Sequence, residues 1–228
     1  MIAICFVVHN QLQYTKWFIE SIARNSYPYH LGFFALDNGS SDGSYEWLNA
    51  MNVSPKVVIR NEGNESLSKG WNRVLQAGLD HGADLLCLTN NDIIVGPGWL
   101  DAIVKEYAKV NGDKAYWLPN GTIDPQNFEQ QVRDRAKTGR TYPGRAGWCM
   151  FFKNSTVREF LPISEELRLW YGDDFIHWKL KQAGYQMLIV DDCCCYHYGS
   201  KTVQTVGVIQ HIIDADRATY NRITGDHL

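Results

Sequence analysis

The sequence predicts an α/β fold in which a mostly parallel sheet is covered by helices on both faces. The N-terminal part of the chain alternates short apolar runs of strand length with longer stretches of helical spacing, which is the pattern of β-α-β units. The chain has 228 residues, of which 45% are hydrophobic and 21% charged, so one large domain can bury a full core.

The first part of the chain supplies strands and helices in alternation. The apolar runs that have strand length are Ile2–Val8, Gly32–Leu36, Lys56–Ile59 and Asp84–Leu88. Helical spacing occurs at 12–22, 41–51 and 67–79, and Pro97-Gly98 opens a further helix that runs through Tyr107. Ligands of parallel sheets bind beyond the carboxyl ends of the strands, so the residues that follow each strand are the candidates for a site.

The second part of the chain is less regular. Periodicity fades from Asn111 to Arg145, where glycine and proline punctuate a polar stretch, and a loop of this length is often functional. Structure resumes at 148–152, with helices expected at 154–160 and 174–183 and short strands at 186–190 and 194–198. Weak helical spacing at Val206, Ile209, Ile212 and Ile213 predicts a helical tail at 201–228.

Charge and apolar patterning exclude several classes of protein. The net charge is −3, from 22 basic and 25 acidic side chains, which argues against binding of nucleic acid by bulk charge. No apolar run approaches the roughly 20 residues of a membrane span, and Ile2–Val8 is too short for a secretory signal. Six cysteines, three of them consecutive at 193–195, are typical of a reducing compartment. We therefore expect a cytoplasmic protein without a membrane span.

Two common cofactor motifs are missing, and one possible metal pattern is weak. No G-x-G-x-x-G follows the first strand, and no G-x-x-x-x-G-K-[ST] occurs, so a dinucleotide-binding or P-loop site is not favoured. Cys193, Cys195 and His197 alternate on one strand face and could ligate zinc. Because no second ligand pair stands at finger-like spacing, buried thiols are the better interpretation.

The end of the second strand carries the strongest signal. Asp37 leaves an apolar run, a Gly/Ser turn follows, and Asp42 precedes a predicted helix, although Asp42 also fits an Asx turn or helix N-cap. This block resembles the V-D-N-G-S-x-D-G-S signature of family 2 glycosyltransferases. Further blocks resemble that family in the same order, at 7–10, 60–64 with 70–72, 88–92 with 97–100, 170–174, 182–185 and 196–200.

The resemblance spans about residues 1–200 and implies a GT-A fold, which is a Rossmann-like sheet with a small second β element. We expect 1–200 to form one domain and 201–228 a C-terminal helical tail. The implied activity is inverting transfer of a sugar from a nucleoside diphosphate, with UDP-sugar as the expected donor, to a hydroxyl of an unknown carbohydrate or other acceptor.

The resemblance also implies the residues that bind the donor. Asp37 can accept the imide N–H of uracil or thymine, and the resemblance assigns it to the base. Val8, His9 and Asn10 end the first strand beside it and are placed around base and ribose, although His9 could also be a packed histidine. The remaining donor candidates are Asn61, Asn72, Asn90 and Asn91. The first two fit turn and cap roles equally well.

A divalent cation is expected at the diphosphate, because it stabilises the charge that develops on that leaving group. Asp92 supplies a hard oxygen ligand, and His197 supplies an imidazole, which Mn²⁺ accepts more readily than Mg²⁺. Asn90 replaces the first carboxylate of a D-x-D motif, which should weaken binding of the metal. The alternative is that 90–92 is only a polar turn.

The resemblance assigns the general base to Asp174, with Asp173 orienting base or acceptor. The pair also fits a helix N-terminus, where carboxylates stabilise the helix dipole. Trp148, Trp170 and Tyr171 are candidates for an acceptor platform or for core packing. In the tail, Asp216, Tyr220, Asn221 and Arg222 could touch an acceptor, but a solvated helix is preferred.

Two alternatives to a glycosyltransferase stay open. A nucleotidyltransferase shares the nucleotide-binding half, but does not need the Gly-Asp-Asp block and His197 in these places. A catalytically silent nucleotide- or sugar-binding module is supported by Asn90 and by the short chain.

Overall fold

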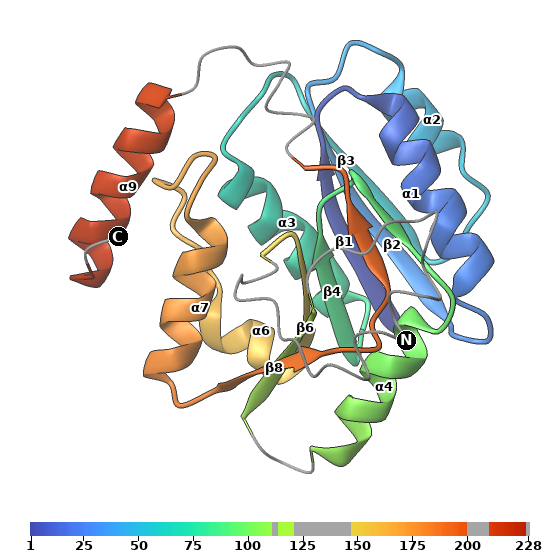
Figure 1. Ribbon diagram of the computed structural model, residues 1–228. Coiled ribbons are helices and arrows are strands. Elements are labelled where there is room, and N and C mark those ends of the chain that lie inside the picture. The colour runs from blue at the N-terminus through green and yellow to red at the C-terminus, as the bar shows by residue number, and fades with distance from the viewer. Residues whose placement is uncertain (111–113, 121–146, 200–209, 227–228) are drawn as a thin grey trace.

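A seven-stranded sheet runs through the centre of the computed structural model, in the order β3-β2-β1-β4-β7-β6-β8 (Figure 1). The structure describes residues 1–110, 114–120, 147–199 and 210–226. The sheet strands are β1 (Ile2–Val8), β2 (Leu31–Asn38), β3 (Lys56–Asn61), β4 (Leu85–Thr89), β6 (Ala115–Pro119), β7 (Cys149–Lys153) and β8 (Gln186–Val190). Strands β3, β2, β1 and β4 are parallel, whereas β7 is antiparallel to β4 and β6. The predicted mostly parallel sheet is confirmed.

Helices cover both faces of this sheet. One face carries α3 (Leu67–Asp80), α6 (Asn154–Phe160) and α7 (Gly172–Gln182), and the other carries α1 (Leu12–Asn25), α2 (Ser44–Ala50) and α4 (Trp99–Lys109). Strand β1 shows why two faces are needed. Its residues Ala3, Cys5 and Val7 pack on the α3 side, and the alternate residues pack on the α1 side. All seven residues of β1 are buried, as expected for a central parallel strand.

A second, two-stranded sheet pairs β5 (Ile93–Val95) with β9 (Cys195–His197) in antiparallel register. It brings the segment after β4 against a strand about one hundred residues later in the chain, with Ile93 opposite His197. All six cysteines lie among the described residues, are buried and form no disulfide there, in agreement with the expectation of buried thiols for Cys193 and Cys195. Burial raises the pKa of the Cys193 thiol.

The sequence missed two strands and misjudged the C-terminal helix. Strand β6 falls in the stretch 111–145 that was expected to be a loop, and β5 is only three residues long. Of the rest of that stretch, 111–113 and 121–145 lie outside the described residues, as do 201–209 and 227–228 of the tail. Helix α9 (Gln210–Thr224) lies beside α7 (Figure 1). It is not a fully solvated helix, because Asp216 and Tyr220 are each 2% exposed and Tyr220 packs into the core.

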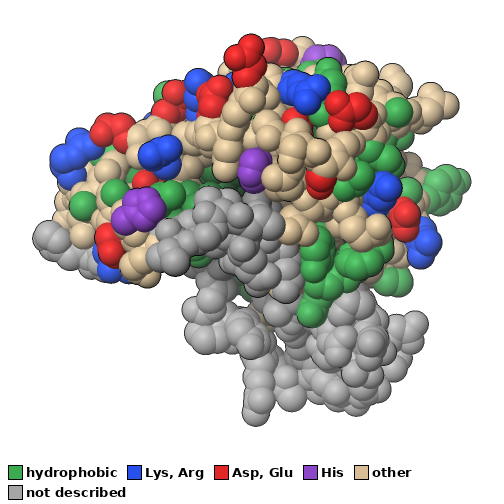
Figure 2. Space-filling view, turned by 90° about the horizontal axis from the view of Figure 1, so that it is seen from above, with side chains coloured by type: hydrophobic (Ala, Val, Ile, Leu, Met, Phe, Trp, Pro, Cys, Tyr) green, Lys and Arg blue, Asp and Glu red, His purple; other side chains and the backbone are tan. Residues whose placement is uncertain are grey.

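The described helices include none that is both long and apolar enough to cross a membrane. On the face seen in Figure 2, acidic and basic side chains are intermixed over the described surface.

Candidate active site

A cavity of about 310 Å³ opens where the carboxyl ends of β1, β2 and β4 meet. The strand ends contribute Val7, His9, Asn38 and 90–92, and His197 comes from β9. Later segments complete the wall with Gly147, Trp148, Arg168, Leu169, Trp170, Asp173 and Ile212. The remaining lining residues precede or begin α3, and they are Asn64, Glu65, Leu67 and Trp71.

Asp37 lies in β2 directly before the lining residue Asn38 and is fully buried. Its Oδ2 accepts a hydrogen bond of 3.2 Å from the backbone N–H of Ser40, and Arg60 Nε lies 3.9 Å from the same oxygen. The other oxygen, Oδ1, is buried and has no hydrogen-bond partner among the described residues. A buried carboxylate oxygen without a partner is costly, so this atom is suited to accept a hydrogen bond from a ligand.

The residues that follow β1 are held by the turn after β2. His9 Nδ1 donates to the backbone oxygen of Asn38 at 2.9 Å, which leaves Nε2 as the acceptor nitrogen of the ring. Asn10, at φ 55°, accepts from the backbone N–H of Ser41 at 2.9 Å and donates its own N–H to Ser40 Oγ at 2.8 Å. Val8 is buried in the α1-side core, pairs in register with Asp37 and is not among the residues that line the cavity.

The loop before α2 depends on Asp42. Its carboxylate accepts from the backbone N–H of Leu12 at 2.8 Å and from the hydroxyl and backbone N–H of Ser44 at 2.6 and 3.1 Å. Burial by itself would raise the pKa of Asp42, but these hydrogen bonds outweigh it and lower the pKa. The N-cap of α2 is Gly43, at φ 86°, and Asp42 stands one position before it. Because Asp42 binds both Leu12 and Ser44, it links the start of α1 to the start of α2.

Two predicted donor residues do not reach the cavity. Asn72 exchanges two hydrogen bonds with the backbone of Ile163, at 2.9 and 2.8 Å. Asn61 donates to Asn38 Oδ1 at 2.8 Å and accepts from the guanidinium of Arg73. Both side chains therefore link neighbouring parts of the fold, and neither is among the residues that line the cavity.

Asn38, which was not among the predicted site residues, is the link between β2 and the loop before α3. Its Nδ2 donates to Asn64 Oδ1 at 2.8 Å and to the backbone oxygen of Glu65 at 2.9 Å. Its Oδ1 accepts from Asn61 and from the backbone N–H of Glu65. Its place directly after Asp37 in the signature block was the signal that could have identified it.

Asp92 and His197 meet on the floor of the cavity because β5 pairs with β9. The distance from Asp92 Oδ1 to His197 Nε2 is 3.1 Å, and Asn90 Nδ2 lies 3.3 Å from the same nitrogen. Trp148 stacks on the imidazole, with ring centroids 5.1 Å apart and planes at 19°. Asn91 lines the cavity as well, but its amide donates to Thr15 Oγ1 at 2.9 Å and so anchors the loop to α1.

The Asp92–His197 pair has the dimensions of a partial cation site. Adjacent ligands of an octahedral cation with bonds of about 2.1 Å are separated by about 3 Å. The carboxylate of Asp92 is 5% exposed, so it is already withdrawn from water. The described residues contain no cluster of three or more His, Cys, Asp or Glu side chains that could hold a metal. The pair therefore fits a cation whose other ligands come from a bound molecule and water.

The acidic pair opens α7, where Tyr171 at φ 63° is the N-cap and both carboxylates stand in the first turn. Asp173 lines the cavity, and its carboxylate packs so tightly against Gly147 that a Cβ there would overlap with it. Asp174 is half-buried and is not among the lining residues. Both carboxylates are favourably placed with respect to the helix dipole.

The three predicted aromatic residues divide into two groups. Trp148 and Trp170 line the cavity, and the buried indole N–H of Trp170 has no hydrogen-bond partner within the described part of the chain. Tyr171 instead turns toward α9, where its hydroxyl accepts from Arg217 Nε at 2.9 Å and its ring packs on Tyr220. No local signal marked Arg168, Leu169 or Ile212 as lining residues, because they reach the cavity only through long-range packing.

The seven-stranded sheet and the small second sheet place the chain in the GT-A fold class. The family model for glycosyl transferase family 2 matches residues 3–159, and the chain belongs to this family. A search of curated proteins finds no match.

Solved structures with the same fold support this class at low sequence identity. Mannosyltransferase PcManGT from Pyrobaculum calidifontis, in complex with GDP-Man and Mn²⁺, is 16% identical with a TM-score of 0.65, over 97% of this chain and 64% of that one. S. aureus TarS 1-349 is 15% identical with a TM-score of 0.61, over 94% and 64%. GalNAc-T7 with UDP, GalNAc and Mn²⁺ is 17% identical with a TM-score of 0.63, over 86% and 43%. The chain thus spans between 43% and 64% of these proteins.

Proposed function

We propose that this protein is an inverting, metal-dependent glycosyltransferase that moves a sugar from a UDP-sugar to an acceptor hydroxyl. The observation that carries the proposal is that one cavity brings together the ends of β1 and β2, the Asp92–His197 pair and the carboxylate of Asp173. These groups are suited, in that order, to a nucleoside, to the cation of a diphosphate and to an acceptor hydroxyl.

The base of the nucleotide is proposed to bind at Asp37. The free Oδ1 is an acceptor for the imide N–H of uracil, and Arg60 compensates the negative charge on the other oxygen. Related structures hold UDP or GDP-Man, and a guanine also offers N–H donors to a carboxylate. GDP is therefore the control nucleotide in every binding experiment.

The cation is proposed to be Mn²⁺, with Mg²⁺ as the weaker substitute, because imidazole is among the ligands. Asp92 and His197 would hold it together with the diphosphate. When bound, it supplies Lewis-acid stabilisation of the charge that develops on the leaving diphosphate. Trp148 keeps the His197 ring in place by stacking. Asn90 is a neutral neighbour at the position where the D-x-D motif implied by the family resemblance has a carboxylate.

The acceptor hydroxyl is proposed to transfer its proton to the acidic pair at the start of α7. Asp174 is the base that the family resemblance implies, and Asp173 is the member of the pair whose carboxylate lines the cavity. In inverting transfer the base stands on the acceptor side, opposite the leaving diphosphate. The first turn of α7 favours the ionised carboxylate that this role requires.

The test begins with binding and continues with turnover. Calorimetry should show UDP binding in Mn²⁺ that is at least tenfold tighter than GDP binding and that weakens in excess chelator. A panel of UDP-sugars, each incubated with Mn²⁺ and a set of free saccharides, should then show release of UDP. Binding without turnover on any sugar would favour a silent nucleotide-binding module, and release of pyrophosphate from a nucleoside triphosphate and a sugar phosphate would favour a nucleotidyltransferase.

A further inference from the structure

The segment 166–171, which carries three residues of the cavity wall, is held from the outside by a carboxylate of the C-terminal helix. Asp216 of α9 is 2% exposed. Its Oδ1 accepts from the backbone N–H of Arg168 at 3.1 Å, and its Oδ2 accepts from those of Leu169 and Trp170, both at 2.8 Å. A buried carboxylate is stable only when it is well hydrogen-bonded, and three consecutive backbone N–H groups provide that.

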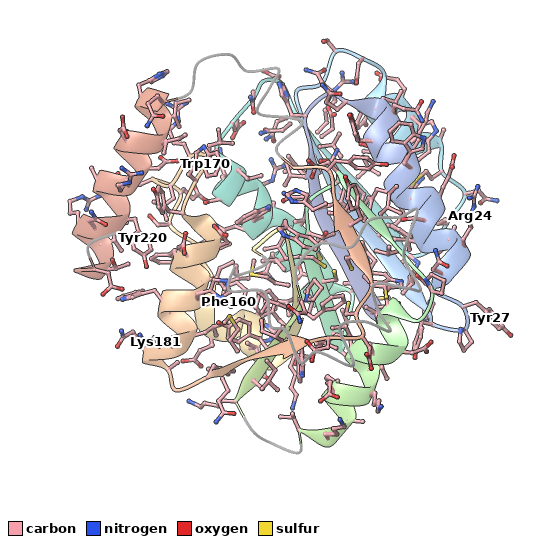
Figure 3. All side chains as sticks on the ribbon, viewed as in Figure 1. Arg24, Tyr27, Phe160, Trp170, Lys181 and Tyr220 are labelled. Carbon is pink, nitrogen blue, oxygen red and sulfur yellow. The ribbon has the colours of Figure 1, made fainter. Side chains whose placement is uncertain are left out.

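The start of α3 holds the other side of the same segment. Ser66 Oγ donates to the backbone oxygen of Leu167 at 3.1 Å, and the backbone N–H of Leu67 donates to that of Arg168 at 2.7 Å. Figure 3 shows Trp170 between α9 and the start of α3. The segment therefore has three of its N–H groups bound to α9 and two of its carbonyl groups bound to the start of α3, so it is held on both sides.

Further contacts of α9 extend this hold to the start of α7. Arg217 Nε donates to the hydroxyl of Tyr171 at 2.9 Å, and Tyr220 packs on the ring of Tyr171, with centroids 5.7 Å apart. Ile212, on the same helix, lines the cavity itself. Helix α9 thus contributes Ile212 to the lining of the cavity, and it also makes the contacts that hold the lining residues 168–170 in place.

We infer that α9 is part of the acceptor site, and that Asp216 is the positioning residue that fixes the wall formed by Arg168, Leu169 and Trp170. This inference rests on the proposed function for the identity of the acceptor side. That wall directly precedes the acidic pair of α7, whereas the donor groups stand at the ends of β1 and β2. The wall offers an indole face, an aliphatic side chain and one guanidinium, a combination that suits a saccharide acceptor.

The variant Asp216→Asn tests this inference, because the amide keeps the shape but loses the charge and one acceptor oxygen. The matched control is Asp214→Asn, which removes the same charge from an exposed position of the same helix. In Asp216→Asn, hydrogen exchange of the backbone amides of 168–170 should be at least tenfold faster than in wild type, with exchange in β1 unchanged. The control should leave exchange at 168–170 within twofold of wild type.

Binding and kinetics separate positioning from general loss of structure. UDP affinity in Mn²⁺ should stay within twofold in Asp216→Asn, while the KM for the saccharide acceptor found in the panel should rise at least fivefold.

If Asp216→Asn does not fold, Arg217→Gln replaces it and should accelerate exchange at 170–172 at least threefold. Unchanged exchange at these amides, or a loss of UDP affinity parallel to the loss of transfer, would overturn the inference. Failure of wild type to bind UDP would instead count against the proposed function, and the exchange result would still decide the role of Asp216.

Discussion

The two halves of the cavity are built in different ways. The half that is proposed to bind the donor, called the donor half below, consists of residues at or just after the ends of neighbouring parallel strands, so residues such as His9 and Asn38 meet because the sheet aligns these strand ends. The half that is proposed to bind the acceptor, called the acceptor half below, consists of Trp148, the segment 168–170 and Ile212, which come from distant parts of the chain and are fixed by long-range polar contacts such as those of Asp216. The donor half is therefore a property of the sheet, whereas the acceptor half depends on how later segments pack onto it.

This difference makes a functional prediction. Changes in the donor half should alter nucleotide affinity, and changes in the acceptor half should alter turnover or acceptor binding at constant nucleotide affinity. Each experiment below tests whether nucleotide affinity and turnover respond separately to changes in the two halves.

The largest effect is expected at the cation pair, which stands between the two halves. Asp92→Ala removes the only carboxylate of the pair, and the rate of sugar transfer in Mn²⁺ should fall by roughly 10³-fold, because leaving-group stabilisation is a large catalytic effect. His197→Ala should lower the rate of sugar transfer less, since the carboxylate of Asp92 and the diphosphate remain as ligands. Full activity in excess chelator would contradict the assignment of the metal.

The next largest effect is expected at the acidic pair. Asp174→Asn keeps the shape of the side chain, and its kcat should fall by roughly 10²–10⁴-fold at unchanged UDP affinity, which is the usual cost of losing a general base. Asp173→Asn is the control on the adjacent position. If Asp173→Asn lost turnover to this extent and Asp174→Asn kept it, the base would be the cavity-lining member of the pair.

A smaller effect is expected at the base-binding carboxylate. In Asp37→Asn one oxygen is replaced by an amide nitrogen. UDP binding should become weaker by about 1–3 kcal/mol, which is the usual cost of a buried polar group without a hydrogen-bond partner. Asn72→Ala is the informative contrast, because its side chain binds the backbone of Ile163 instead of the cavity. It should lower the free energy of unfolding by about 1–2 kcal/mol and leave UDP affinity unchanged. Denaturant titration and calorimetry measure the two quantities.

The smallest effect concerns Asp42, which supports the donor half from outside. Its pKa is lowered in the folded state, so its hydrogen bonds contribute stability above the unfolded pKa of about 4, and this contribution is lost as the pH falls through the lower folded value. Because the carboxylate is largely solvated, the contribution should be about 0.5 kcal/mol. The difference in unfolding free energy between wild type and Asp42→Asn should therefore shrink from pH 7 to pH 3.

The same division explains how much the sequence could predict. The strands and helices up to α4, apart from β5, follow from apolar runs and helical spacing, because the β-α-β pattern is local. Strand β6 was missed because it is short and stands in a stretch rich in glycine and proline, and β5 because three residues carry no periodicity. In the site, Asp37 stands at the end of β2 and Asp92 follows β4, so both could be found from the apolar runs that precede them. The sequence names Asp216 only as a tail residue that could touch an acceptor, and its hydrogen bonds to the backbone of 168–170 could not be predicted, since these partners lie 46 to 48 residues away.

The most direct test of this account is a parallel UDP titration, in Mn²⁺, of wild type, Asp37→Asn and Asp174→Asn, each followed by the rate of transfer at saturating donor. The account predicts that Asp37→Asn loses UDP affinity by roughly 5- to 150-fold, the equivalent of about 1–3 kcal/mol, and that Asp174→Asn binds UDP as wild type does but transfers sugar at least about 100-fold more slowly. Equal UDP affinity in all three proteins, or a loss of affinity in Asp174→Asn as large as that in Asp37→Asn, would contradict the division of the cavity into a donor half and an acceptor half.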